Sequence, residues 1–239
     1  MKTKLLLFAA CLLYVDASFA QYHDGDLVFG INAGATYGSV ANVPEILVSE
    51  DYYSGFILSD KDLWGAGAGI FVNYKYPGSC FAVQPEISYT QLNTRLNYSD
   101  VYDYLYDVNF KYSFVNIACL LKVYPVAGLN IGVGPQVGFN LTPNEILFSS
   151  NGEAQFGPNA VQEQNLRTVL KGKNDFSIGL TLGYEFKFGL GIDARYYFGL
   201  SDLVETQVNG YKFIENSNRS HSLWINVCWA FPFDNYFFK

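Results

Sequence analysis

The feature that most constrains this chain is a strict alternation of large apolar residues with small or polar ones. It is clearest in residues 175–188, where every even position from Phe176 to Phe188 is apolar or aromatic. Every odd position from Asp175 to Lys187 is glycine, polar or charged. Because successive side chains of a β-strand point to opposite faces, this pattern predicts a strand with one apolar and one polar face.

The same alternation recurs along the rest of the chain and predicts eight strands in all. They cover residues 27–37, 63–76, 81–92, 108–124, 129–141, 174–188, 191–202 and 220–231. Strands of soluble proteins usually have about 5–6 residues, whereas a tilted strand needs about 9–11 to cross a bilayer. In residues 108–124 the apolar positions change from even to odd at Phe114–Val115, which predicts a β-bulge there.

The connections between these strands alternate between short and long. Residues 77–80, 125–128 and 189–190 are short, and residues 38–62, 93–107, 142–173 and 203–219 are long. Short turns at one end and long loops at the other are typical of outer-membrane barrels, whose short turns lie in the periplasm. An even number of strands then places both ends of the barrel domain on the periplasmic side.

These observations predict an all-β fold, an eight-stranded antiparallel up-and-down transmembrane β-barrel. A sheet in hydrocarbon has to close, because every backbone N–H and C=O must be paired there. The bulky face should point to lipid, since the small and polar face suits the narrow interior of such a barrel. A soluble, lipocalin-like barrel would reverse the two faces. Aromatic residues near strand ends are expected to form interfacial girdles: Tyr37, Trp64, Tyr74, Tyr76, Tyr89, Tyr124 and Trp229.

Composition agrees with a membrane barrel and excludes several other classes. Charged residues are 15% of the 239 residues, against about 25% in soluble domains, and aromatic residues are 18%. Outside the N-terminus the chain has no apolar run of about 18 residues, which excludes a helical membrane protein. A net charge of −7 argues against a nucleic-acid partner.

The N-terminus has the features of a secretory signal peptide. Residues 1–4 include Lys2 and Lys4 and precede an apolar run over 5–15, and Ser18 and Ala20 occupy the small positions before a cleavage site at Gln21. The alternative is a lipoprotein site at Cys11. We therefore expect a signal peptide over 1–20 and a barrel domain over 21–239, exported to the outer membrane of a Gram-negative cell.

Five short segments resemble the PorT-type family of outer-membrane β-barrels found in Bacteroidetes-like bacteria. They are residues 84–89, 114–124, 132–136, 176–184 and 193–200, and together they are spread over most of residues 27–231. The resemblance implies an eight-stranded barrel, one branch of which assists protein secretion, and it implies no enzyme. The chain departs from such barrels at its end, because Phe231 and Phe233 are followed by six further residues instead of a terminal aromatic.

Charges of both signs occupy positions expected to face the barrel interior. Buried charges are tolerated when they are paired and hydrogen-bonded, so a salt-bridge network that fills the lumen is one interpretation. A gated path for protons or ions is the other. The candidates are Lys75, Glu86, Lys122, Glu185, Asp193 and Arg195.

Residues 98–106 are dense in tyrosine and aspartate and are the candidate binding loop. Tyrosine offers a large contact area at low entropic cost, so Tyr98, Tyr102, Tyr104 and Tyr106 could bind a partner or a glycan. The alternative is that these residues extend the two neighbouring strands as a β-ribbon beyond the membrane.

Catalysis has little support in the sequence. No nucleophile-elbow or phosphate-binding motif is present, and three mature cysteines with two histidines lack metal-ligand spacing, so we expect no cofactor or metal. His221, with Asp202 or Glu205 in reach, is the one candidate for chemistry at the outer rim. We expect a non-enzymatic protein with a structural or interaction role, embedded in outer-membrane lipid and contacting a protein partner through extracellular loops or periplasmic turns. A secretion-accessory role, a small gated channel and a rim enzyme are the finer alternatives.

Overall fold

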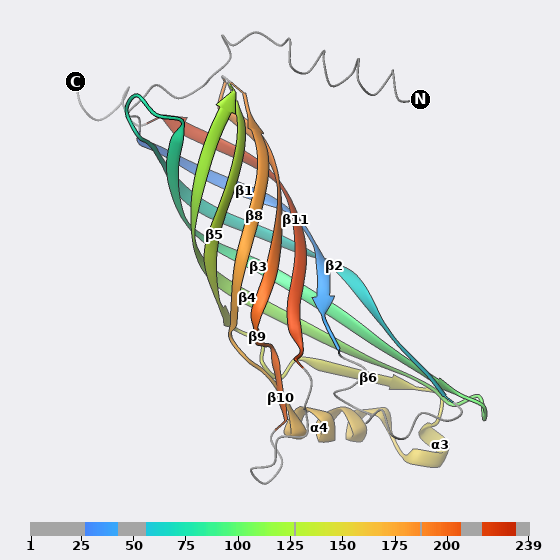
Figure 1. Cartoon of the computed structure of the whole chain (residues 1–239). Coiled ribbons are helices and arrows are strands. Elements are labelled where there is room, and N and C mark those ends of the chain that lie inside the picture. The colour runs from blue at the N-terminus through green and yellow to red at the C-terminus, as the bar shows by residue number, and fades with distance from the viewer. Residues whose placement is uncertain (1–26, 43–55, 127, 187, 207–216, 233–239) are drawn as a thin grey trace, which may run out of the picture.

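The structure, a computed structural model, describes residues 27–42, 56–126, 128–186, 188–206 and 217–232. In this part of the chain, eight long antiparallel strands form a closed ring (Figure 1). They are β1 (Leu27–Val40), β2 (Phe56–Lys75), β3 (Phe81–Asp100), β4 (Leu105–Val126), β5 (Leu129–Asn140), β8 (Asp175–Glu185), β9 (Leu190–Asp202) and β11 (Arg219–Pro232).

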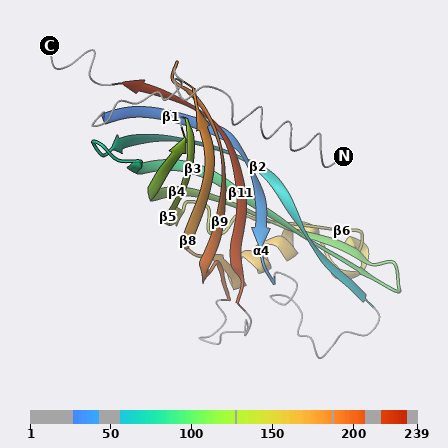
Figure 2. The ribbon, with the colours of Figure 1, turned by 45° about the horizontal axis from the view of Figure 1, so that its top comes forward.

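The ring closes between the first and last strands. β1 pairs with β11 from Val28↔Pro232 to Val40↔Ser220, and every other strand of the ring pairs with its sequence neighbour in the ring. Figure 2 shows the strands curving around a common axis. The ring therefore has no free edge, which is the condition for a sheet to span hydrocarbon.

The two ends of the barrel differ. At one end, here called the turn end, tight connections join β2 to β3, β4 to β5 and β8 to β9, and β1 begins and β11 ends there (Figure 1). Gly78, Gly128 and Gly189 have φ of 66°, 81° and 100° in these turns, a conformation that other residues adopt at a steric cost. At the opposite end, the loop end, the connections are long.

Bulky apolar side chains cover the outside of the ring. Ile178, Leu180 and Leu182 are 39%, 49% and 56% exposed, whereas the inward Ser177 and Thr181 of the same strand are buried. The outer face of the wall is thus suited to lipid and the inner face to polar packing, as the alternation predicted.

Aromatic residues gather on this outer face near both ends. Tyr37 and Trp64 lie with ring centroids 4.9 Å apart near the loop end, and Phe186 and Phe188 stack at 5.5 Å at the turn end. The expected girdle position of Tyr124 is wrong, because its hydroxyl points into the lumen and bonds with Glu185 and Asn73. An even position on β4 faces inward, and Tyr124 follows that rule.

The β-bulge expected at Phe114–Val115 is also wrong. Both residues keep an unbroken register with β3 and with β5. Even positions of β4 face inward throughout, and what changes near Phe114 is their chemistry, from Asn116 and Lys122 to Phe110 and other apolar residues. The register shift in this region lies instead in β2, between Asp62 and Gly67.

The reason for this change is that the barrel extends beyond its lipid-facing band of apolar side chains, here called the apolar belt, at the loop end. There the outside meets water, so the polar residues of β4, such as Lys111, face outward and the apolar ones face inward. This inner apolar cluster, here called the plug, is buried. It consists of Val40, Leu92, Leu96, Val108, Phe110, Tyr112, Phe114, Ile146, Leu170, Leu203 and Val204.

The strands β2, β3 and β4 are longer at the loop end than the alternation predicted. β2 begins at residue 56 instead of 63, β3 ends at 100 instead of 92, and β4 begins at 105 instead of 108. These additions form a ribbon that leans away from the barrel (Figure 1). At the turn end, β8 finishes at Glu185, three residues before the expected end.

The long connection over residues 142–173 is folded instead of being a plain loop. It contains β6 (Ile146–Ser150), α3 (Glu153–Phe156), α4 (Asn159–Val169) and β7 (Leu170–Gly172), and β7 pairs with β10 (Val204–Thr206). β6 pairs with the ribbon part of β4. We call the ribbon of β2, β3 and β4, together with β6, α3 and α4, the platform.

α4 covers the free edge of β6. The amide of Phe148 donates to the Glu163 carboxylate at 3.1 Å, and Arg167 donates to the carbonyl of Ile146 at 2.9 Å. Glu163 and Arg167 also form an ion pair of 2.7 Å on the helix surface. Exposed strand edges invite pairing with other chains, and these contacts satisfy part of that edge.

No helix in the described ranges is long and apolar enough to cross a membrane.

Candidate functional site

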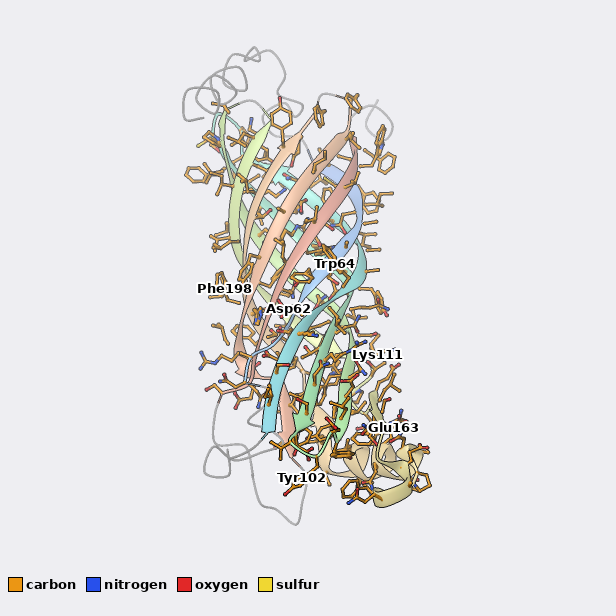
Figure 3. All side chains as sticks on the ribbon, turned by 90° about the vertical axis from the view of Figure 1, so that its right-hand side faces the viewer. Asp62, Trp64, Tyr102, Lys111, Glu163 and Phe198 are labelled. Carbon is orange, nitrogen blue, oxygen red and sulfur yellow. The ribbon has the colours of Figure 1, made fainter. Side chains whose placement is uncertain are left out.

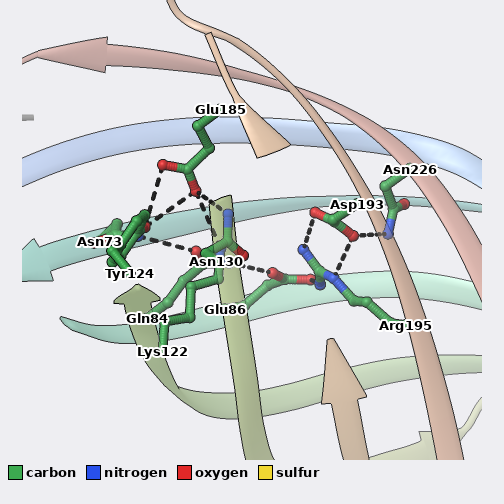
Figure 4. A network of polar contacts seen from close by, with 10 residues as sticks. All are labelled: Asn73, Gln84, Glu86, Lys122, Tyr124, Asn130, Glu185, Asp193, Arg195 and Asn226. Atoms are coloured by element: carbon green, nitrogen blue, oxygen red, sulfur yellow. Dashed lines mark hydrogen bonds and ion pairs between the residues drawn. The ribbon is translucent and has the colours of Figure 1, made fainter. Parts of the chain in front are cut away.

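Arg195 is the centre of the polar interior. Its guanidinium donates to Glu86 at 2.6 Å and to the two carboxylate oxygens of Asp193 at 2.8 and 3.1 Å (Figure 4). All three side chains are almost wholly buried, and the guanidinium also lies 5.1 Å from the ring of Trp224. A buried guanidinium with two carboxylate partners and an aromatic neighbour is compensated in both charge and hydrogen bonding.

Glu185 organises a second group nearer the turn end. Its carboxylate accepts from Lys122 at 3.3 Å, from the hydroxyl of Tyr124 at 3.1 Å and from the amide of Asn130 at 3.2 Å. These partners come from β4 and β5, whereas Glu185 ends β8. Lys122 therefore pairs with Glu185, and not with Glu86 on the neighbouring strand.

Neutral polar side chains join the two groups. Tyr124 accepts from Asn73 at 2.9 Å, Asn73 donates to Gln84 at 3.3 Å, and Gln84 donates to Glu86 at 3.2 Å. On the far side, Asn226 donates to Asp193 at 3.0 Å. The result is one continuous network of ten side chains, here called the lumen network (Figure 4): Asn73, Gln84, Glu86, Lys122, Tyr124, Asn130, Glu185, Asp193, Arg195 and Asn226.

Five of the six predicted interior charges belong to this network. Lys75, the sixth, lies at the turn end of β2 and is half-buried. The sequence reasoning missed the neutral members, although Gln84, Asn130 and Asn226 occupy inward positions of the same alternating strands. That position was the signal that could have found them.

A small cavity separates the lumen network from the plug. Its volume is about 30 Å³, and its lining includes Asn116, Gln136, Tyr197 and Trp224 on the network side and Phe114 on the plug side. A space of this size holds about one water molecule. Gln136 Oε1 and Trp224 Nε1 are buried without a protein partner, so a water molecule here would satisfy polar groups.

The tyrosines of residues 98–106 lie in the platform, at the far end of the ribbon. Tyr98 and Tyr106 stack with centroids 4.5 Å apart, and Tyr104 lies 5.8 Å from Tyr106 and 4.7 Å from Phe156 of α3. Burial, followed by the neighbouring Tyr98 and Tyr104, raises the pKa of Tyr106 to about 12. β3 and β4 thus continue as a ribbon through this segment, as the ribbon alternative anticipated, and Tyr104 joins the tyrosine stack to α3, a contact that the sequence did not predict.

Tyr102 differs from the other three because it is 87% exposed at the ribbon tip. The turn that presents it is fixed, since the Asp100 carboxylate accepts from the amides of Tyr102 and Tyr104 at 2.9 and 3.0 Å. Asn151, at the end of β6, donates to the carbonyl of Asp103 at 2.7 Å and accepts from Leu105 at 2.9 Å. The tip is thus an ordered surface.

His221 lies on the outer face near the loop end, where it meets Asp62, a carboxylate that the sequence analysis did not name. Its Nε2 is 3.2 Å from the Ser39 hydroxyl and 3.7 Å from Asp62, whereas Glu205 pairs with Lys173. A hydrolytic triad needs the acid and the nucleophile on different ring nitrogens. Both contacts here involve Nε2, and Ser39 is buried, so the geometry does not form a triad.

The thiols of Cys80, Cys119 and Cys228 are free. Within the described ranges, no three side chains of the metal-ligating types come together. The candidate arrangements for a function are the inner polar network and the outer platform.

Comparison with known proteins agrees with the architecture. Residues 19–205 match the family model described as outer membrane protein beta-barrel domain. No curated protein sequence matches the chain. This family model does not identify the PorT-type branch, so the resemblance to that branch remains a hypothesis.

Solved structures similar to the chain are low in sequence identity. The outer membrane protein OprG from Pseudomonas aeruginosa is 14% identical over 89% of this chain and 99% of its own, with a TM-score of 0.48. Neisserial surface protein A is 12% identical over 86% and 97%, with a TM-score of 0.36. Ail of Yersinia pestis, solved with the heparin analogue sucrose octasulfate, is 15% identical over 87% and 99%, also at 0.36.

Proposed function

We propose that this chain, which belongs to the outer membrane protein β-barrel domain family, is a closed barrel that displays a partner-binding platform on the cell surface. The outer-membrane location and the eight-stranded ring are the premise. The proposal adds that the loop end faces outward and that the platform carries the activity. Long loops are extracellular and short turns periplasmic in such barrels, which supports this orientation.

The observation that carries the proposal is an ordered set of exposed apolar side chains at the ribbon tip. Ile57, Val101 and Tyr102 are 71%, 73% and 87% exposed, and they lie beyond the apolar belt that lipid covers. Exposed apolar residues on a rigid support, away from lipid, are typical of protein interaction sites. Tyrosine at such a site gives contact area with little loss of entropy.

A protein is therefore the partner class that the tip supports best. The resemblance to PorT-type barrels implies one particular partner, a component of a protein-secretion apparatus. This finer assignment is part of the proposal and rests on the resemblance alone.

Site-specific crosslinking tests the proposal. A photoreactive amino acid placed at Tyr102 in the full-length protein should give an adduct of defined mass on intact cells. Gln164, exposed on α4 of the same platform, is the matched control position and should give none. No adduct from Tyr102, or the same adducts from both positions, contradicts the proposal.

The channel alternative has a direct test as well. The buried side chains of the lumen network and the plug both occupy the described part of the lumen, and eight-stranded barrels are normally just wide enough for side chains to fill. We expect purified protein to be silent in planar-bilayer recordings over a range of pH and salt. Reproducible single-channel steps that disappear in an Arg195→Met variant would favour a gated path through the lumen network.

A further inference from the structure

The outer face of the ribbon is continuous with the lipid-facing outer wall of the barrel, because residues of the same parity point outward in both parts of β3 and β4. On β3 the outward positions run from Ile87 and Tyr89 in the apolar belt to Arg95 and Asn97 in the ribbon, all at odd numbers. On β4 the outward series runs from Ile117 to Lys111. The residues that follow the apolar belt on this face must therefore lie beside the lipid headgroups.

Three cations occupy this stretch. Lys61 is the cross-strand partner of Arg95, and Arg95 is in turn the partner of Asn109, whose neighbour on the same face is Lys111. Cross-strand and diagonal neighbours are within about 5–8 Å, so the three charges form one patch. Arg95 donates to Asn109 at 2.8 Å, and none of the three forms an ion pair with a residue of the described ranges.

The distance of these charges from the edge of the apolar belt indicates which part of the lipid they face. Tyr89 marks the end of the apolar belt, and its hydroxyl donates to Ser113 at 2.9 Å. Lys111 is two residues beyond Ser113, about 7 Å along the strand, and Arg95 is six residues beyond Tyr89, about 20 Å along a tilted strand. A phospholipid headgroup layer adds only about 5–7 Å to each side of the hydrocarbon. Figure 3 shows Lys111 farther toward the loop end than Trp64 and Phe198.

A polar hollow of about 440 Å³ adjoins the cations on the same face. Its lining is rich in hydroxyl and amide groups, and the Oδ1 of Asn97 is buried there without a hydrogen-bond partner. Sugar hydroxyls are donors and acceptors that match such a lining. The polar side chains are Ser59, Lys61, Asn97, Tyr98, Ser99, Tyr106, Asp107, Ser149, Ser150 and Asn151, and Ile57 and Leu105 complete the lining.

From this arrangement we propose that the outer face of the ribbon binds the phosphorylated saccharide headgroup of an outer-leaflet glycolipid. Lys111 meets its phosphates nearest the hydrocarbon, Arg95 and its cross-strand partner Lys61 meet them farther out, and the polar hollow takes its sugars. The inference rests on the proposed orientation, but not on the partner of the tip. Tyr102 and Val101 are not part of this site, and Ile57, which lines the hollow, is altered in neither test, so the two proposals can fail separately.

The test uses full-length protein in phosphatidylcholine nanodiscs and measures the binding of fluorescent lipopolysaccharide. Each lysine near a charged lipid surface contributes a factor of about 5, so Lys61→Gln combined with Lys111→Gln should weaken binding roughly 25-fold. Lys171→Gln combined with Lys173→Gln removes two exposed lysines from the β7 region and is the matched control. It should leave binding within about 2-fold of the unmodified protein, since Lys173 already pairs with Glu205 at 3.6 Å and Lys171 is the cross-strand partner of the same glutamate.

Two further arms separate the sources of the signal. Asn97→Ala leaves the charge unchanged and should still weaken binding, because it acts on the polar hollow. Inorganic phosphate should not displace the glycolipid at ionic strength matched with chloride, because the sugars contribute to binding. Equal losses in the two lysine pairs, no loss in either, or full displacement by inorganic phosphate would overturn the proposal. The gel shift of folded barrels on heating confirms that each variant is folded.

Discussion

Arg195 and Glu86 are 109 residues apart in the sequence and come from strands on opposite sides of the ring, yet their side chains meet at 2.6 Å. Replacing Glu86 with Gln leaves Arg195 with Asp193 alone. Loss of one partner from a buried ion pair costs on the order of 3 kcal/mol. We expect Glu86→Gln to lower the free energy of unfolding by about that amount, measured by urea unfolding in lipid vesicles.

The control for this variant is Glu145→Gln, which removes an exposed carboxylate and should change stability by less than about 0.5 kcal/mol. A double-mutant cycle with Arg195→Met should show strong coupling, because Glu86→Gln has little left to remove once the guanidinium is gone. Additive effects would mean that the two side chains do not interact in the membrane.

The close approach of the β4 backbone to Gly134 leads to a second prediction about stability. A Cβ at this inward position of β5 would overlap the backbone carbonyl of Cys119 on β4, which cannot move without opening the ladder. Gly134→Ala should therefore lower stability by about 3 kcal/mol or prevent folding. Gly138→Ala on the same strand meets only side chains, Asn116 and Phe114 closest, and should cost about 1 kcal/mol. The heat-modifiability of the two variants on gels gives the comparison, and equal folded fractions would contradict it.

The packing of Tyr106 predicts a loosening of the platform at high pH. Its pKa rises from 10.0 to about 12 because burial disfavours the phenolate. A raised folded-state pKa means that the stabilisation is complete below pH 10 and is lost as the pH rises toward 12. Near-ultraviolet circular dichroism should follow this loss, and Tyr106→Phe should shift it to higher pH. An unchanged profile in Tyr106→Phe would show that another group controls the transition.

The orientation of the barrel can be read from two glycines in open turns. A Cβ at Gly157, between α3 and α4, or at Gly78, in the β2–β3 turn, would meet nothing within 4 Å. An epitope inserted at Gly157 should be stained by antibody on intact cells. The same epitope at Gly78 should be stained only after the outer membrane is permeabilised. The reverse pattern would invert the barrel and remove the basis for both proposals.

Sequence reasoning succeeded where one face of a strand meets lipid and the other meets polar packing. β5 was predicted over 129–141 and β9 over 191–202, and the structure has them at 129–140 and 190–202. It failed where that contrast disappears. Residues 56–62 of β2 lie in the ribbon, and there the alternation of apolar and polar residues no longer indicates a strand.

The apparent bulge at Phe114 has the same origin. Alternation reports that two faces differ, but it does not report which of them is inside. Within the apolar belt the outward side chains of β4 are apolar, and beyond it they are polar. The alternation of apolar and polar residues therefore inverts while the backbone continues unchanged. The sequence signal was real, and it marked the border between lipid and water.

For the candidate site, too, the sequence predicted some features and not others. The inward positions of Glu86, Lys122, Asp193 and Arg195 followed from periodicity. Their partners did not, because the partner of a lumen side chain is set by strand tilt and ring closure. These bring β3 and β9 together across the interior, although neither is a neighbour of the other in the sheet.

The amino-acid sequence by itself determined that this chain forms long membrane-crossing strands, and it assigned the charges to the face opposite the apolar one. This follows because side-chain direction in a strand depends only on the parity of the residue number. The tertiary structure alone decided which charges meet, where the lumen is filled, and that residues 142–173 fold onto a ribbon at the loop end. Those outcomes depend on contacts between segments far apart in the chain, which local periodicity does not encode.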